Sequence, residues 1–499
     1  MEAFSGLILG LKGIFTGMNM GALFIGTFLG TVVGILPGLG PAATMAVLLP
    51  LTAGMGPAAG LIMLGGIFFG CQYGGSTTSI LLNIPGEASS VMTCLDGHQM
   101  AKKGRAGAAL TAAAIGSFIA AQIGIVGLTF LAMPLARFAL RFGPPEYFAI
   151  TLVGLLMLTN VSGGSFAKNM IMAILGIMLG TVGMDPTHGE IRLDFGIYKL
   201  AKGIDYIPVL IGLFGIAEIF AWLITKEAVP RRLPSIKLRD LYPTSEEWRR
   251  MFPPIFRGGI LGFLIGLLPG PGPITSTYVS YALEKKVSKR REEFGHGAIE
   301  GVAGPESANN AASIGQMVPL LSLGLPFTAL TAMMLGAIMM QGITPGPLFI
   351  VKRPDVFWVV VVSFYLGNFL LVIMNLPFIP LLTWVLRTPM WLLMAVVTLM
   401  CIIGTYAIGN EILDIWVMLG FGVMGLLMRW FDYQAAPLVL GMVFGPLMER
   451  SLLQSMIIFQ GNPWRFFERP LSGTLFILAI LGFLIFGLVK LYYRRRSRT

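Results

Sequence analysis

The chain has 499 residues, of which 55% are hydrophobic and 12% charged, and its formal net charge is +11. An average soluble protein has about 25% charged residues, so this composition excludes an ordinary soluble globular domain. The positive charge does not indicate nucleic-acid binding, because the Lys and Arg residues cluster beside hydrophobic spans, as in the cytoplasmic loops of membrane proteins. We therefore expect a protein of the lipid bilayer with no nucleic-acid partner.

Several long stretches carry no charged residue. They cover residues 13–86, 106–136, 258–283, 307–351, 356–386, 388–410 and 471–489. Each reaches the roughly 20 residues that a helix needs to cross the hydrocarbon, and the longer ones hold two or three crossings. We predict an all-α polytopic membrane protein with about ten to fourteen membrane segments, including hairpins that enter without crossing. The N-terminal residues include Glu2 and lack a basic start, so we expect no cleaved signal peptide.

A predicted helix break comes first in the chain, at residues 30–41, which read GTVVGILPGLGP. An unpaired backbone N–H or C=O in lipid costs several kcal/mol, so a Pro and Gly cluster at membrane depth must be buried in protein or line a polar cavity. The start of a half-helix at such a break presents N–H groups and a positive dipole end, which suit an anion. The predicted substrate-binding residues here are Pro37, Gly38 and Gly40.

A polar segment follows at residues 71–90, CQYGGSTTSILLNIPGEASS; we call it the first polar segment. Its hydroxyl residues precede an Ile-Pro tip, which predicts a re-entrant hairpin beside a hydrated cavity or a bound ion. Helix packing is the alternative for any single Ser or Thr. A solvated tip is the alternative for Glu87. The predicted substrate ligands are Ser76, Thr77, Thr78 and Asn83, and the predicted gate residues are Pro85, Gly86 and Glu87.

Glu218, in GLFGIAEIFAWL, is the most isolated acidic residue of an apolar segment. Such a residue is a functional candidate, although a hydrogen bond to a neighbouring helix is the reading we favour. Residues 226–250 follow, and they are rich in Lys, Arg and Pro. This composition predicts a cytoplasmic linker between two halves of the chain.

The break motif recurs at residues 262–273, GFLIGLLPGPGP, and is followed by a second polar segment at residues 304–330. Amide and hydroxyl oxygens are hard ligands that suit sodium, and half-helix ends hold such ions in transporters. Capping of the helix that follows is the alternative for Glu306. The predicted substrate ligands are Pro269, Gly270, Gly272 and Ser313; the predicted cation ligands are Glu306, Ser307, Asn309 and Asn310; Pro326 is a gate candidate.

Charge placement indicates that the two halves are inverted repeats. Aligning the break motifs sets the basic cluster at residues 285–291 over residues 53–59, which carry no charge. Equivalent loops then lie on opposite sides of the membrane. The predicted parts are residues 1–225 and 251–470 as inverted repeats with broken helices, 226–250 as the linker, and 471–499 as an extra helix with a cytoplasmic basic tail.

Matching breaks in two halves indicate a secondary transporter that works by alternating access. The sequence has no G-x4-GK[ST] phosphate loop, which disfavours an ATP-driven pump. A passive anion channel is the main alternative, and an intramembrane enzyme is a weaker one. We predict no catalytic residue and no cofactor apart from a coupling cation, Na⁺ or H⁺. Because Arg is scarce in the spans, we expect dipoles, hydroxyls and this cation to recognise an anionic substrate.

Four strings, GILPGLGP, YGGSTTSILLNIPGE, LLPGPGP and GPESANNAA, closely resemble the large membrane subunit of the tripartite tricarboxylate transporters, TctA. The resemblance covers nearly the whole chain. It implies a multi-pass protein of the bacterial inner membrane that imports citrate or a related di- or tricarboxylate with sodium or proton coupling. It also implies two partners, a small membrane subunit (TctB-like) and a periplasmic substrate-binding protein (TctC-like). The site residues that it implies lie at 37–41, 74–87, 269–273 and 304–313.

Overall fold

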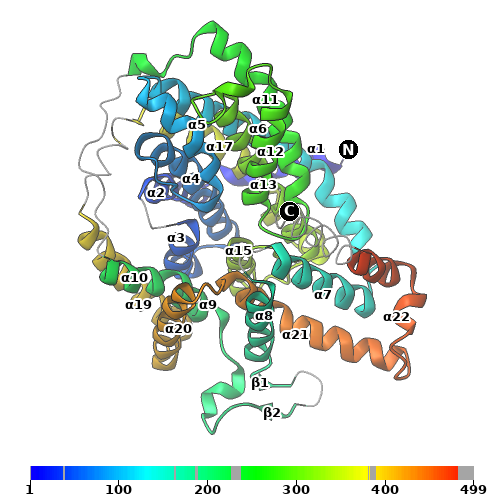
Figure 1. Cartoon of the computed structure of the whole chain (residues 1–499). Helices are drawn as coiled ribbons and strands as arrows, with labels where there is room; N and C mark the ends of the chain where they lie inside the picture. Colours follow the sequence, from blue (N-terminus) through cyan, green and yellow to red (C-terminus); the bar gives the residue numbers. More distant parts are fainter. Residues whose placement is uncertain are drawn as a thin grey trace, which may run out of the picture. The chain divides into compact units, whose positions relative to one another are not determined.

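The structure is a computed structural model, and it describes residues 2–36, 40–161, 165–185, 189–225, 238–379, 381 and 389–481. These residues are almost entirely helical, and their only strands form one short antiparallel pair (Figure 1). Eight of the described helices are long and apolar enough to cross a membrane, and five shorter apolar helices of 10–17 residues accompany them. The prediction of an all-α polytopic membrane protein is confirmed.

Two compact units make up the chain. Unit 1 contains residues 1–139 and 205–431, and unit 2 contains residues 140–204 and 432–499. This division does not test the predicted halves, so the inverted repeats and their boundaries stay predictions. Residues 226–237 of the predicted linker and 482–499 of the predicted C-terminal segment lie outside the described residues.

Unit 1 holds the helices on which both polar segments lie. They are α1 (Glu2–Ile14), α2 (Gly17–Ile35), α3 (Pro41–Leu48), α4 (Pro57–Leu82), α5 (Val91–Lys102), α6 (Ala106–Ala139), α9 (Tyr206–Leu210), the π-helical turn η4 (Ile211–Ile216), α10 (Ala217–Thr225), α11 (Ser245–Gly266), α12 (Gly272–Val287), α13 (Glu300–Gly315), α14 (Met317–Leu323), α15 (Ala329–Met340), α16 (Pro347–Lys352), α17 (Pro354–Asn375), α19 (Met390–Gly409) and α20 (Ile412–Trp430).

Unit 2 is smaller and contains no predicted site residue. Its elements are α7 (Pro144–Val161), α8 (Phe166–Gly180), β1 (Gly183–Met184), β2 (Ile191–Arg192), α21 (Ala435–Ile458) and α22 (Arg465–Glu468). The helix at Pro470–Leu481 covers the described part of the predicted C-terminal helix.

The backbones of α2 and α4 pack in direct contact. A Cβ atom at Gly30 would lie 2.5 Å from the carbonyl oxygen of Ile67, and one at Gly34 would lie 2.4 Å from that of Cys71. Small residues permit such close approach where lipid supplies no hydrophobic drive for helix association. The G-x3-G part of the first break motif therefore serves helix packing.

The corresponding glycines of the second motif pack α11 against α13 in the same manner. A Cβ atom at Gly262 or at Gly266 would lie 2.2 Å from the carbonyl oxygen of Ala308 or of Ala312, respectively. Each break motif thus begins with a glycine pair that holds its helix against the helix that carries the polar segment of the same half.

Both break motifs interrupt helices. In the second, α11 ends at Gly266, α12 begins at Gly272, and Gly270 has a φ of 134°. In the first, α2 ends at Ile35 and α3 begins at Pro41, while residues 37–39 lie outside the described residues. The predicted break is therefore confirmed in full for the second motif.

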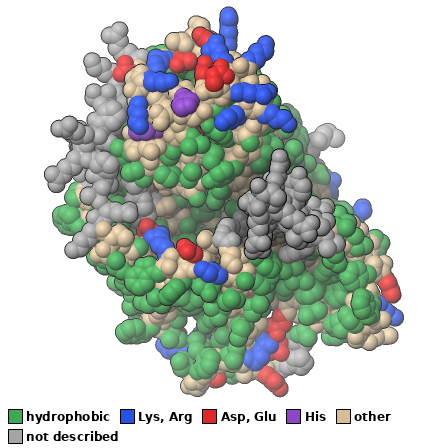
Figure 2. Space-filling view, in the orientation of Figure 1, with side chains coloured by type: hydrophobic (Ala, Val, Ile, Leu, Met, Phe, Trp, Pro, Cys, Tyr) green, Lys and Arg blue, Asp and Glu red, His purple; other side chains and the backbone are tan. Residues whose placement is uncertain are grey.

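Figure 2 shows hydrophobic side chains over most of the drawn face, with Lys and Arg gathered toward the end of unit 1 where α5 and α11 lie. Many large apolar side chains are exposed, among them those of Phe4, Phe15 and Phe24. An exposed apolar surface of this kind fits contact with lipid rather than water.

Candidate functional site

The second polar segment places a polar face on a fully buried helix. Glu306, Asn309, Asn310 and Ser313 of α13 are spaced i, i+3, i+4 and i+7, so they share one side of that helix. Each has less than 2% of its surface exposed. Polar side chains buried in this way need hydrogen-bond partners, and those partners come from three other helices and from the tip after α4.

The first polar segment supplies the most direct partners. Ser76 of α4 donates its hydroxyl to Oε2 of Glu306 over 2.6 Å, and the side-chain amide of Gln72 donates to Oγ of Ser313. Gln72 and Ser76 lie one turn apart on α4. The two polar segments, predicted separately from the sequence, therefore meet in the interior of unit 1.

Glu306 is the buried carboxylate at the place where the two polar segments meet. Its other oxygen, Oε1, accepts a hydrogen bond from the hydroxyl of Thr93 on α5. Among the described residues no Lys, Arg or His side chain pairs with Glu306, so its negative charge rests on two hydroxyl donors. A buried charge is costly unless it is paired, which makes Glu306 a natural anchor for a cation.

Glu87 is a second carboxylate without a cationic partner among the described residues. Its Oε1 accepts from the Asn309 side-chain amide over 3.0 Å and from the Ser89 hydroxyl over 2.5 Å. Glu87 is half-buried and follows the tip after α4. Ser76 and Ser313 also donate to the backbone carbonyls of Gln72 and Asn309, which connects these groups. We call the side chains of Gln72, Ser76, Glu87, Thr93, Glu306, Asn309 and Ser313 the polar network.

Oxygen acceptors outnumber donors in and beside the polar network. Oε1 of Gln72, Oδ1 of Asn309 and Oδ1 of Asn375 are buried without a hydrogen-bond partner, as is the hydroxyl of Ser307. Asn310 instead donates to Oγ of Ser117 over 2.7 Å and to its own helix. Two carboxylates together with unpaired carbonyl-type oxygens form a hard-oxygen environment that suits an alkali cation.

Asp96 shows the opposite arrangement in the same unit. Its Oδ1 accepts backbone N–H groups of Gly295, Gly297 and Ala298 over 2.7–2.9 Å, and its Oδ2 accepts the Tyr281 hydroxyl over 2.9 Å. Asp96 is fully buried, and its charge is satisfied by four donors. It therefore fixes α5 to the loop before α13 and needs no cation.

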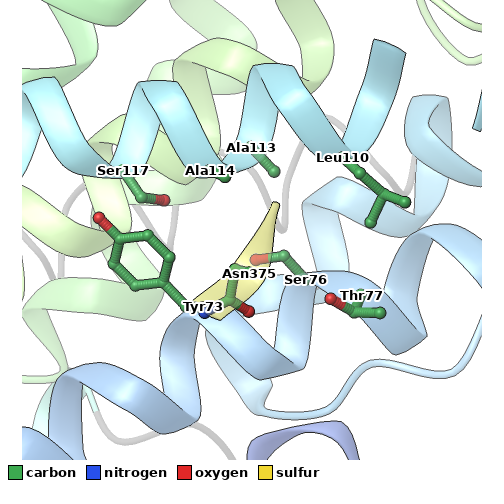
Figure 3. A pocket seen from close by; sticks show the side chains of 8 residues that line it. All are labelled: Tyr73, Ser76, Thr77, Leu110, Ala113, Ala114, Ser117 and Asn375. Atoms are coloured by element: carbon green, nitrogen blue, oxygen red, sulfur yellow. The ribbon is translucent and has the colours of Figure 1, made fainter. Parts of the chain in front are cut away.

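A small cavity of about 10 Å³ adjoins the polar network (Figure 3). Figure 3 shows Ser117 on α6 facing α4, with Tyr73, Ser76 and Thr77 on the α4 side and Asn375 between. A space of about 10–15 Å³ holds one water molecule, so this cavity fits a single water or small ion. It is lined by Tyr73, Ser76, Thr77, Leu110, Ala113, Ala114, Ser117 and Asn375.

A larger cavity of about 350 Å³ lies at the first break and the tip after α4. Gly40, Pro85, Gly86 and Glu87 line one part of it, so the first break and three predicted gate residues meet there. Pockets for small organic ligands commonly hold about 300–1,000 Å³, which places this cavity in the range for a small molecule. Ala88 follows Glu87 at the same tip, and the remaining walls come from α3, η4, α10 and α20, with Ala42, Ala43, Leu213, Phe214, Glu218 and Arg429.

Arg429, at the end of α20, also lines the larger cavity. The expectation that dipoles, hydroxyls and a coupling cation recognise an anionic substrate stays a prediction. Arg429 forms an ion pair with Glu218. Arg429 on α20 is thus the partner on a neighbouring helix that we expected for Glu218.

Other predicted site residues lie apart from the polar network or form hydrogen bonds and caps within their own helix. Thr78 bonds the carbonyl of Gly75 in its own helix over 3.1 Å, and Asn83 is an exposed left-handed C-cap of α4. Gly270 accepts from the side chain of Gln316 over 3.3 Å, beside Gly272. Pro269 is half-buried in the second break, and Pro326 is buried at the tip after α14. Pro37 and Gly38 lie outside the described residues.

Sequence reasoning missed several members of these sites: Gln72, Tyr73, Thr93, Ser117, Asn375 and Arg429. Ser117, Asn375 and Arg429 are single polar residues in apolar helices, and such isolation was the available signal for these three. Gln72 and Tyr73 stand in the first polar segment. Nothing in the spacing of Thr93 or Asn375 relates them to Glu306 or Ser76, because only the tertiary fold brings these helices together.

Comparison with known proteins places this architecture in a family. The profile of the "Tripartite tricarboxylate transporter TctA family" matches residues 20–440. A protein of Agrobacterium vitis named "Uncharacterized 52.8 kDa protein in TAR-I ttuC' 3'region" is 44% identical over 480 residues, which is 96% of this chain and 95% of that protein.

A second Agrobacterium vitis protein, "Uncharacterized protein in TAR-II ttuC' 3'region", is 43% identical over 220 residues, or 44% of this chain and 91% of that protein. No solved structure matches the chain significantly. The match to the family profile spans both break motifs and both polar segments, so the chain is a multi-pass membrane protein that belongs to the tripartite tricarboxylate transporter TctA family.

Proposed function

We propose that this transporter subunit imports citrate or a related di- or tricarboxylate by symport with sodium, fed by a periplasmic binding protein. Family membership supports a tricarboxylate transporter subunit that works with partner subunits. The observation that carries the coupling is the polar network, in which Glu306 is buried without a cationic partner among the described residues.

Sodium binding would resolve the electrostatic cost of the polar network. A bare carboxylate in a low-dielectric interior is unfavourable, and one adjacent monovalent cation makes the pair neutral. The unpaired Oδ1 of Asn309 and Oε1 of Gln72 offer further hard oxygens close to Glu306 and Glu87. A proton on Glu306 would also neutralise it, so proton coupling is the outcome that the experiment below must separate.

Glu87 connects the cation to the substrate. It belongs to the polar network through Asn309 and also lines the larger cavity. An anionic substrate in that cavity is repelled by a charged Glu87, and a bound cation removes part of the repulsion. By linkage, the substrate then raises the affinity for the cation to the same degree, and this cooperativity favours the doubly loaded state that a symporter carries across.

We place the transporter in the bacterial inner membrane with a cytoplasmic C-terminus and with a small membrane subunit as its constant partner. The two polar segments and two breaks form the part that changes access, in keeping with a secondary transporter. The alternative is a passive anion channel, which would also use helix breaks.

Uptake of labelled citrate into proteoliposomes tests the proposal. The vesicles contain this chain and its small membrane partner, and the assay runs with and without binding protein, an inward sodium gradient or an inward proton gradient. Concentrative uptake that requires sodium and binding protein supports the proposal. Uptake driven by protons alone overturns sodium coupling, and equilibration without accumulation indicates a channel. No citrate uptake rejects citrate, and the assay is then repeated with other di- and tricarboxylates.

A further inference from the structure

Arg429 and Glu218 form an ion pair on the wall of the larger cavity. The arginine side chain is 55% exposed, whereas that of Glu218 is 17% exposed. The cavity therefore has an accessible guanidinium backed by a more buried carboxylate. No other Lys or Arg lines this cavity among the described residues.

The guanidinium of Arg429 is only partly used. One of its Nη atoms donates to Oε2 of Glu218, and no further hydrogen bond involves this side chain in the described part of the chain. Arg105 and Arg257, in contrast, each donate from Nε and Nη2 to both oxygens of a glutamate. Arginine binds carboxylates best through this two-pronged geometry, which Arg429 retains for another carboxylate.

Close helix packing fixes the backbone that carries Arg429. Met418, Gly422, Gly425 and Arg429 are spaced i, i+4, i+7 and i+11, so they follow one side of α20. A Cβ atom at Gly425 would lie 2.7 Å from Cβ of Ala217, next to Glu218. The part of α20 that carries Arg429 is therefore packed closely against the η4–α10 segment, which carries Glu218.

We propose that Arg429 binds a carboxylate group of the transported anion in the larger cavity, and that Glu218 positions the guanidinium in the absence of substrate. This inference rests on the proposed function and names the residue that contacts its substrate. The anion is a small molecule with two or more carboxylates, because one carboxylate engages Arg429 while the others remain to interact with the cation site through Glu87. Glu218 uses one Nη atom of Arg429 and places a negative charge beside the guanidinium, so removing that charge favours an anionic substrate.

Citrate uptake by the variants Arg429→Gln, Arg429→Lys and Glu218→Gln tests the assignment, with Arg105→Gln as the control. Arg105 pairs with Glu247, which is 17% exposed like Glu218, but neither of them lines the larger cavity. We expect Arg429→Gln to raise KM at least about tenfold, because a hydrogen bond to a charged group contributes about 1.5–3 kcal/mol. We expect the KM of Arg429→Lys to lie between those of Arg429→Gln and the wild type, because lysine keeps the positive charge but lacks the two-pronged guanidinium.

Glu218→Gln separates substrate binding from a structural role. If Arg429 binds substrate, Glu218→Gln keeps or lowers KM while Arg429→Gln raises it. If the pair only holds two helices together, both variants reduce the amount of folded complex and leave the KM of the remaining complex unchanged. Equal KM values for all four chains and the wild type overturn the proposal.

A binding assay without transport completes the test. Ala88 lines the cavity and is exposed, so Ala88→Cys is open to maleimide labelling, whereas native Cys71 and Cys401 are buried; labelling of the parent chain corrects for Cys94. Citrate with sodium should protect this cysteine, and adding Arg429→Gln should abolish the protection. Protection that survives Arg429→Gln overturns the inference and leaves the proposed function intact. Failure of every carboxylate to protect the cysteine or to enter vesicles with wild-type chain overturns the proposed function itself.

Discussion

Asn309 donates its side-chain amide to Oε1 of Glu87 over 3.0 Å, and this single hydrogen bond joins the buried face of α13 to the wall of the larger cavity. On the α13 side, Asn309 lies one turn from Glu306. On the other side, Glu87 meets the space assigned to the substrate. Glu87 is therefore one hydrogen bond away from the helix that carries Glu306.

Replacing Asn309 with Ala should weaken sodium activation of uptake. The variant removes the donor to Glu87 and one unpaired oxygen, so we expect the sodium concentration for half-maximal uptake to rise about tenfold, the effect of about 1.4 kcal/mol. The measurement is citrate uptake across a sodium series. Asn169→Ala is the control, because Asn169 is a buried amide of unit 2 that donates to Thr159. An unchanged sodium curve for Asn309→Ala would move the cation site elsewhere.

Glu306→Gln should abolish the dependence of uptake on sodium. The neutral amide removes the charge that attracts the cation, and it still fits beside Ser76 and Thr93. Asp96→Asn is the matched control, since Asp96 is equally buried but fully hydrogen-bonded. That control should lower the thermal stability of the purified complex and leave the sodium curve unchanged. Identical sodium curves for Glu306→Gln and wild type would contradict the cation assignment.

Gly270→Ala should reduce uptake at every sodium concentration. Gly270 has a φ of 134°, and a side chain in such backbone costs about 1–3 kcal/mol, which distorts the second break. Gly104→Ala controls for strain alone, because Gly104 has a φ of 75° in an exposed turn between α5 and α6. Maximal uptake rates distinguish the two variants. Normal rates for Gly270→Ala would show that the geometry of this break is not needed for transport.

Gly30→Ala should destabilise the contact between α2 and α4. The added methyl would lie 2.5 Å from the carbonyl oxygen of Ile67, and overpacking of this kind costs about 1–3 kcal/mol. Gly21→Ala on the same helix meets nothing within 4 Å, so it should be neutral or slightly stabilising through higher helix propensity. Thermal unfolding of the two variants in detergent provides the comparison, and equal midpoints would refute the packing role of Gly30.

The class of the protein was predictable because hydrophobic length and charge placement depend only on local sequence. The break at Gly270 was also predictable, since Pro and Gly act on their own backbone. The two polar segments could be recognised as separate sites. Their meeting through Ser76 and Glu306 could not be predicted, because it depends on the packing of α4 against α13.

Arg429 shows why the larger cavity was harder to predict. In the sequence it is one arginine at the end of an apolar helix, and such residues commonly anchor a helix at the membrane surface. Its pairing with Glu218 depends on contact between segments 211 residues apart. The same contact explains Glu218. Its isolation in an apolar helix indicated a partner on a neighbouring helix, but the sequence did not identify that partner.

The π-helical turn η4 has a consequence for the phase of the helix that follows it. Each residue advances an α-helix by about 100°, and the wider π-helical turn takes up one extra residue, so rewinding Ile211–Ile216 as an α-helix with all its residues kept would rotate Glu218 by about that angle. Its carboxylate would then leave Arg429, although no side chain of the site had been changed. The register of this segment, rather than the identity of any one residue in it, determines which side chain reaches the cavity.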